Sequence, residues 1–110
     1  MENNIGVLPF SNSVKEKLEF LIDKIVSTTD SVIKVVLFGS YARCDYKVTS
    51  DLDLLVVTTE KLAQGTRGEL SSVFDDCNAD VIFYTEEQLE QSTCMLVNEI
   101  RKDGILLWKK

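Results

Sequence analysis

Residues 35–57 read VVLFGSYARCDYKVTSDLDLLVV and combine two apolar runs with polar groups that buried strands rarely carry. The first run is followed by Gly39 and Ser40, and the second carries Asp51 and Asp53 in the pattern Asp-x-Asp. Charged carboxylates inside an apolar element are costly unless something pairs with them. Their presence here therefore indicates a functional site.

Asp51 and Asp53 are expected to project from the same face of a strand, because side chains at i and i+2 do so. Two like charges this close raise each other's proton affinity unless a cation lies between them. Carboxylate oxygens without histidine or cysteine ligands favour magnesium or manganese over zinc. The pattern predicts a metal site; the alternative is a strand start with two hydrated carboxylates.

Asp80 opens a third predicted strand and would lie beside this pair if the two strands are neighbours. Because it follows Asn78, ordinary turn chemistry is the alternative explanation. Three carboxylates can hold two divalent ions about 3.5–4 Å apart, an arrangement that stabilises an in-line displacement. Gly39 and Ser40 complete the predicted site, since a glycine lets a phosphate approach the backbone and a serine can bind its oxygens. The chemistry implied is attack on a nucleoside triphosphate.

The order of predicted elements indicates an α/β (α+β) fold, a small sheet with helices packed on it. Hydrophobic spacing and capping signals predict three strands and two helices of clear type. We expect helices over 13–27 and 85–101, strands over 32–38, 51–58 and 79–85, a last edge strand over 105–108, and a helix within 59–76 that a loop at 64–68 splits. Strand directions do not follow from the sequence.

Composition limits the classes of protein and of chemistry. The 110 residues, 45% of them hydrophobic, fit one domain over 1–110, and 18 acidic against 12 basic residues disfavour nucleic acid and anionic membranes. No apolar run reaches membrane-spanning length, so we expect a cytoplasmic protein. The chain has no histidine and three widely spaced cysteines, which excludes Ser-His-Asp and Cys-His mechanisms and supports neither a zinc site nor a disulfide framework.

Gly39-Ser40, ten further residues, and then Asp51-x-Asp53 between two hydrophobic strands, with Asp80 in a third, resemble the signature of the DNA polymerase β-like nucleotidyltransferase superfamily. The flanking segments LFGSYAR and SDLDLLVV are most similar to those of the minimal nucleotidyltransferases. The resemblance implies a polymerase β-like fold with a small mixed sheet. It further implies a transferase that moves AMP from ATP to a hydroxyl group.

The resemblance also implies roles for individual residues. Asp51 and Asp53 would ligate two Mg²⁺ ions, for which Mn²⁺ could substitute, with Asp53 bridging them. Asp80 would hold the ion that activates the acceptor hydroxyl and would take its proton. Gly39 and Ser40 would contact the triphosphate, and a nearby cation, Arg43, would add charge at its γ end.

Members of the small subfamily often occur beside a HEPN-type toxin and neutralise it, in some cases by transferring AMP to a tyrosine. The resemblance therefore implies an antitoxin with a protein partner, and it leaves homo- and hetero-oligomers open. One residue departs from the pattern, because Cys44 stands where relatives commonly have glycine after the arginine. Two alternatives stay open: an inactive antitoxin that acts by binding, and an aminoglycoside-type enzyme with a small-molecule acceptor.

Overall fold

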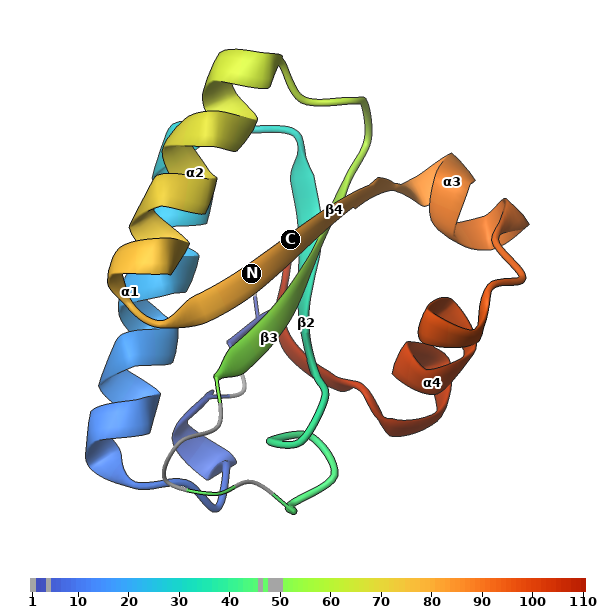
Figure 1. Cartoon of the computed structure of the whole chain (residues 1–110). Coiled ribbons are helices and arrows are strands. Elements are labelled where there is room, and N and C mark those ends of the chain that lie inside the picture. Colours follow the sequence, from blue (N-terminus) through green and yellow to red (C-terminus); the bar gives the residue numbers. More distant parts are fainter. Residues whose placement is uncertain (1, 4, 46, 48–50) are drawn as a thin grey trace.

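The computed structural model describes residues 2–3, 5–45, 47 and 51–110, and its centre is a five-stranded sheet in the order β1-β5-β2-β3-β4 (Figure 1). The strands are β1 (Glu2–Asn3), β2 (Val32–Phe38), β3 (Leu52–Thr58), β4 (Ala79–Thr85) and β5 (Ile105–Lys109). β3 and β4 run parallel, and every other neighbouring pair is antiparallel. The predicted mixed α/β fold is confirmed.

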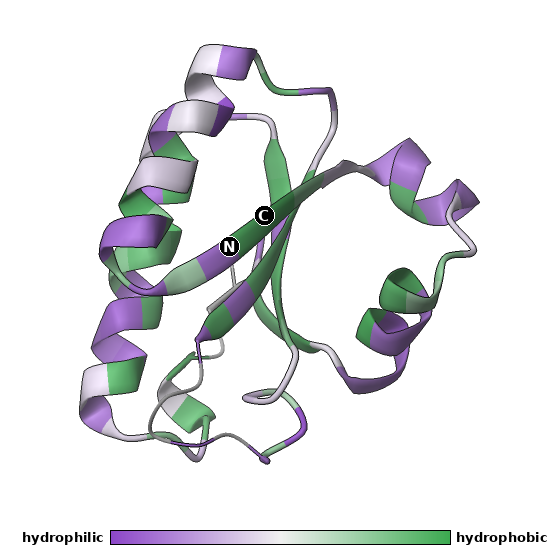
Figure 2. Ribbon diagram, in the orientation of Figure 1, coloured by the Kyte–Doolittle hydropathy of each residue, from purple (hydrophilic) through white to green (hydrophobic). Residues whose placement is uncertain are grey.

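Two long helices cover one face of the sheet. They are α1 (Asn12–Thr28) and α2 (Gln64–Asp76), and a short 3-10 helix, η1 (Ile5–Val7), lies beside α1. α1 turns four residues inward to the core: Leu18, Leu21, Ile22 and Ile25. Figure 2 shows the hydrophobic colour concentrated on the central strands, while the outer sides of the helices are hydrophilic. This face holds the main core, because β-branched strand residues and helix stripes bury their apolar surface there.

Two short helices, α3 (Glu86–Gln91) and α4 (Met95–Asp103), lie on the opposite side of the sheet (Figure 1). The prediction of one helix over 85–101 is wrong. The first helix ends before Ser92, where the backbone is extended, and a second helix begins after Cys94. Arg101 stabilises this break because its guanidinium donates to the carbonyl oxygens of Leu89 and Ser92. Thr85 and Gln88 form a capping box at the start of α3, and α4 ends at Asp103, directly before Gly104.

Three further expectations need correction. The helix at 13–27 is capped by Ser11, whose hydroxyl accepts from the Val14 N–H, so Ser13 lies inside it. Residues 64–68 do not split a helix; they form the first turns of α2, where the Arg67 N–H donates to the Ala63 carbonyl at 3.0 Å. The last strand is not an edge, because β1 pairs with its outer side.

Among the described residues, every helix is too short or too polar to cross a lipid bilayer.

Candidate active site

The site is built where the parallel strands β3 and β4 begin. Asp53 and Asp80 are each the second residue of their strands, and the parallel register pairs them directly. Leu52 and Leu54, on either side of Asp53, point into the core under α1 and α2. Because side chains alternate along a strand, Asp53 projects to the α3–α4 side, the side on which Leu55 packs. The two carboxylates therefore share one face of the sheet.

The electrostatics of Asp53 follow from this placement. Its side chain is half-buried, and burial raises the pKa of its carboxyl group above the ordinary value. The negative charges of Asp80 and Asp51 raise that pKa further, as does a hydrogen bond with Asp80, while the Arg43 guanidinium lowers it. Two carboxyl groups placed side by side in this way offer oxygen donors to a divalent cation, whose charge would offset their repulsion.

Gly39 directly follows β2. It lies beside the pair because Phe38, the last residue of β2, is the register partner of Asp53. Its φ is +78°, in the left-handed region that favours glycine. A Cβ at this position would overlap the Oδ2 atom of Asp53. Only glycine therefore lets the chain turn this close to the carboxylate.

The residues after Gly39 form a hydrogen-bonded turn over 40–44. The Arg43 N–H donates to the Gly39 carbonyl at 3.2 Å, and the Asp45 N–H donates to the Ser40 carbonyl at 3.0 Å. Arg43 also forms an ion pair with Asp45, with 3.5 Å between Nε and Oδ2. Cys44 ends the turn with a φ of 61°, a left-handed backbone value that residues other than glycine rarely adopt.

The predicted site residues are thus brought together to different degrees. Asp53, Asp80 and Gly39 meet, whereas Asp51 is exposed at the entrance to β3 and acts on Asp53 through its charge. No group of three or more histidine, cysteine, aspartate or glutamate side chains in the described part of the chain is close enough to hold a metal ion. Tyr46 and residues 48–50, part of the motif that joins β2 to β3, lie outside the described residues. The donors that do meet, carboxylate oxygens, fit a hard divalent cation.

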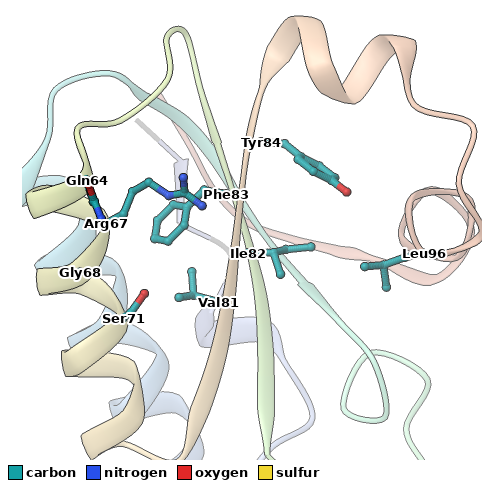
Figure 3. A pocket seen from close by; sticks show the side chains of 9 residues that line it. All are labelled: Gln64, Arg67, Gly68, Ser71, Val81, Ile82, Phe83, Tyr84 and Leu96. Atoms are coloured by element: carbon teal, nitrogen blue, oxygen red, sulfur yellow. The ribbon is translucent and has the colours of Figure 1, made fainter.

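A groove of about 520 Å³ along β4 was not predicted from the sequence, because the sequence pattern assigns residues 64–68 to a loop. It follows β4, with residues of α2 on one side and Leu96 on the other (Figure 3). The guanidinium of Arg67 lies 5.7 Å from the ring centre of Phe83. A usable sequence signal was the pair of small residues Gly68 and Ser71, which share one helix face at i and i+3.

The chain is similar to a known protein family and to a curated protein. The family model described as Polymerase beta, Nucleotidyltransferase matches residues 21–110. A Methanocaldococcus jannaschii protein, provisionally named a protein adenylyltransferase, is 45% identical over 42 residues, 38% of this chain and 42% of that relative. The chain thus spans less than half of the length of this curated relative.

Solved structures share the fold. A provisionally identified nucleotidyltransferase from Sulfolobus solfataricus is 27% identical, with a TM-score of 0.63 over 86% of this chain and 79% of that chain. A chain from the complex of the tri-AMPylated Shewanella oneidensis HEPN toxin with its MNT antitoxin is 20% identical. Its TM-score is 0.61, over 87% of this chain and 72% of that chain.

Proposed function

This chain belongs to the polymerase β nucleotidyltransferase family, and we propose that it transfers AMP from ATP to a hydroxyl group. The observation that carries the proposal is the pairing of Asp53 with Asp80, with Gly39 turned against the Asp53 carboxylate. A carboxylate pair next to a glycine turn provides cation ligands and a close backbone approach for phosphate in one place.

We further propose that Asp51, Asp53 and Asp80 hold Mg²⁺, two ions in the complete complex, with Mn²⁺ as a substitute. The raised pKa of Asp53 supports this assignment, because burial and then the charges of Asp80 and Asp51 disfavour the ionised carboxylate, and a bound cation would favour it. When bound, such ions would neutralise charge on the phosphates and lower the pKa of the attacking hydroxyl. Because oxygen is the only donor type here, the set suits Mg²⁺ better than zinc.

The reaction that we propose is an in-line displacement at the α-phosphorus. The acceptor oxygen forms a bond to that phosphorus, the bond to the oxygen that bridges to the β-phosphate breaks, and pyrophosphate leaves with the electron pair. Asp80 takes the hydroxyl proton, so a phosphodiester to AMP, pyrophosphate and one proton are the products. Gly39 and Ser40 bind the triphosphate, and Arg43 adds positive charge towards its γ end.

The acceptor that we propose is a hydroxyl group of a partner protein. Two relatives support a protein acceptor: the M. jannaschii protein carries the name of a protein adenylyltransferase, and the Shewanella complex holds an AMPylated HEPN toxin with an MNT antitoxin. By this account the chain is the antitoxin of a HEPN-type toxin. We propose a cytoplasmic location, because ATP is the proposed donor.

Transfer of radioactive phosphate tests this function. The purified chain, Mg²⁺ and the product of the neighbouring gene are incubated with ATP labelled either at the α- or at the γ-phosphate. We expect the α-label on the partner protein and none from γ-labelled ATP, because AMP is transferred and pyrophosphate is released. Transfer of the γ-label would contradict the proposed reaction.

The same experiment decides whether the chain is instead an inactive antitoxin. The departure at Cys44 raises this alternative, yet the structure closes the turn with Cys44 in the left-handed region, where glycine is favoured. A stable complex that carries no label would identify a binding protein, and a labelled aminoglycoside without any protein partner would identify a small-molecule enzyme.

A further inference from the structure

β4 is the last strand of the sheet, and no strand among the described residues pairs with its outer edge. Its register to β3 runs from Ala79 to Thr85 without a shift, so no bulge twists the edge away. After Asp80 the strand carries neither a charge nor a proline, the two devices that usually block an open edge. β4 therefore presents backbone donors and acceptors that are free to pair with another extended chain.

The groove along β4 has room for such a chain. On the α2 side, Gly68 and Ser71 are small, and a Cβ added to Gly68 would meet no atom within 4 Å. Gln64 and Arg67 line the same side of the groove, where the Arg67 guanidinium lies over the Phe83 ring. On the opposite side lies Leu96, whose side chain is 38% exposed (Figure 3). The groove thus follows the strand edge, with an apolar side chain on one flank and, on the other, two small residues beside two long polar ones.

The strand that the groove follows begins at the carboxylates. Asp80, Ile82 and Tyr84 alternate with residues that face α2, so they form one row on the side of the candidate site. Two residues of strand correspond to about 7 Å. A chain paired with β4 opposite Ile82 would therefore place its next side chains beside Asp80 and its register partner Asp53.

We propose that β4 binds an extended segment of the acceptor protein as an added strand, which delivers a hydroxyl side chain to the Asp53–Asp80 pair. This proposal rests on the proposed function, because it assigns the route of the acceptor to that site. Continuity between the free edge and the carboxylates favours an acceptor segment. A second copy of the chain is disfavoured, since each copy carries a net charge of −6 and two copies repel.

Two matched variants on α2 test the route. Gly68→Trp fills the groove, whereas Gly65→Trp places the same side chain on the same helix at a position that does not line it; neither Cβ meets an atom within 4 Å. The probe is a synthetic eight-residue peptide of alternating valine and threonine with one tyrosine. A second peptide, N-methylated at alternate residues, lacks the donors that strand pairing needs.

Two readouts are measured for each protein. The first is the KM for the peptide in transfer of α-labelled AMP, and the second is amide hydrogen exchange of residues 79–85 with peptide but without ATP. We expect Gly68→Trp and the N-methylated peptide each to raise the KM by about tenfold or more, since loss of two or three hydrogen bonds suffices for that. Gly65→Trp should match the unmodified protein, and the KM for ATP should stay unchanged in both variants. Exchange of β4 should slow with the unmethylated peptide, except in Gly68→Trp.

Equal KM values for Gly68→Trp and the unmodified protein, or β4 exchange that the peptide does not slow, would overturn the proposal. A dimer in which β4 is protected without peptide would also overturn it and identify a second copy as the occupant. Failure of the proposed function has a different signature: β4 would be protected by the peptide, yet no label would be transferred. Conversely, label on a protein acceptor with unprotected β4 would leave the function standing and refute the docking route.

Discussion

Gly39 lies against the carboxylate of Asp53 so closely that a Cβ on Gly39 would overlap Oδ2. The φ of 78° at Gly39 lies in the left-handed region that favours glycine, so the backbone conformation and the close contact both require glycine at this position. The contact thus joins the two halves of the candidate site, the glycine turn after β2 and the carboxylates of β3 and β4.

Gly39→Ala should therefore displace the Asp53 carboxylate and strain the turn. We expect AMP transfer to fall by at least about 100-fold, because a displacement of about 1 Å at a reacting group has an effect of this size. Steady-state transfer assays with circular dichroism as a check of folding measure this. Gly6→Ala is the matched control, since a Cβ there meets no atom within 4 Å. Full activity of Gly39→Ala would show that the contact is not required.

Asp53→Asn should change the pH dependence of stability. Folding raises the pKa of Asp53. The protonated group therefore stabilises the folded protein fully below the unfolded pKa of about 3.9, and this contribution to stability is lost as the pH rises through the folded pKa. At pH 7 without metal, the ionised carboxylate opposes folding beside Asp80. We expect urea denaturation to find the variant more stable than the unmodified protein at pH 7, with the difference shrinking in acid. A variant that is less stable at pH 7 would refute this sign.

Arg43→Gln should weaken ATP binding more than it weakens folding. The ion pair of Arg43 with Asp45 joins side chains that are 43% and 61% exposed, and such pairs contribute about 0–1 kcal/mol. We expect the KM for ATP to rise by about three- to tenfold through loss of charge at the triphosphate. The acidic limb of the activity profile should also move to higher pH, because Arg43 lowers the pKa of Asp53.

Lys102→Gln is the control for that variant, since it removes one exposed positive charge from α4. If Arg43→Gln and Lys102→Gln gave the same KM for ATP, Arg43 would have no role at the triphosphate.

Cys44→Gly should stabilise the protein despite the flexibility of glycine. The φ of 61° costs a side-chain-bearing residue about 1–2 kcal/mol, and glycine loses about 0.5–1 kcal/mol in chain entropy on folding. The expected net gain in the free energy of unfolding is about 0.5 kcal/mol, measured by urea denaturation. Asn78→Gly, at a φ of 54°, should gain less because asparagine tolerates this region. An equal or larger gain at Asn78 would contradict this explanation.

Much of the fold was readable from short-range patterns. β2 and β4 have the predicted bounds, because β-branched and aromatic runs end at Gly39 and at the capping box of Thr85. The first turns of α2 were missed because Gly65 and Gly68 lower helix propensity by about 1 kcal/mol each. Tertiary packing overrides that deficit, since Leu70 and Phe74 of the same helix are completely buried.

The parts that failed depend on contacts between distant residues. The short strand β1 carries no periodic pattern in its two residues, so the interior position of β5 could not be foreseen. The break between α3 and α4 depends on Arg101, which reaches back to the carbonyl of Ser92. For the site, the sequence pattern predicted the acidic residues. Asp53 and Asp80 lie side by side only because β3 and β4 are parallel and in register, and no short-range sequence pattern predicts that pairing.

The central claim is that the carboxylates at the start of β3 and β4 hold the cations that drive AMP transfer. The most direct measurement is transfer of α-labelled AMP by the Asp51→Asn, Asp53→Asn double variant in Mg²⁺, with circular dichroism recorded on the same sample. Because asparagine keeps the volume of aspartate and removes its charge, we predict an unchanged spectrum and no detectable transfer. A folded double variant that still transfers the label would contradict the account.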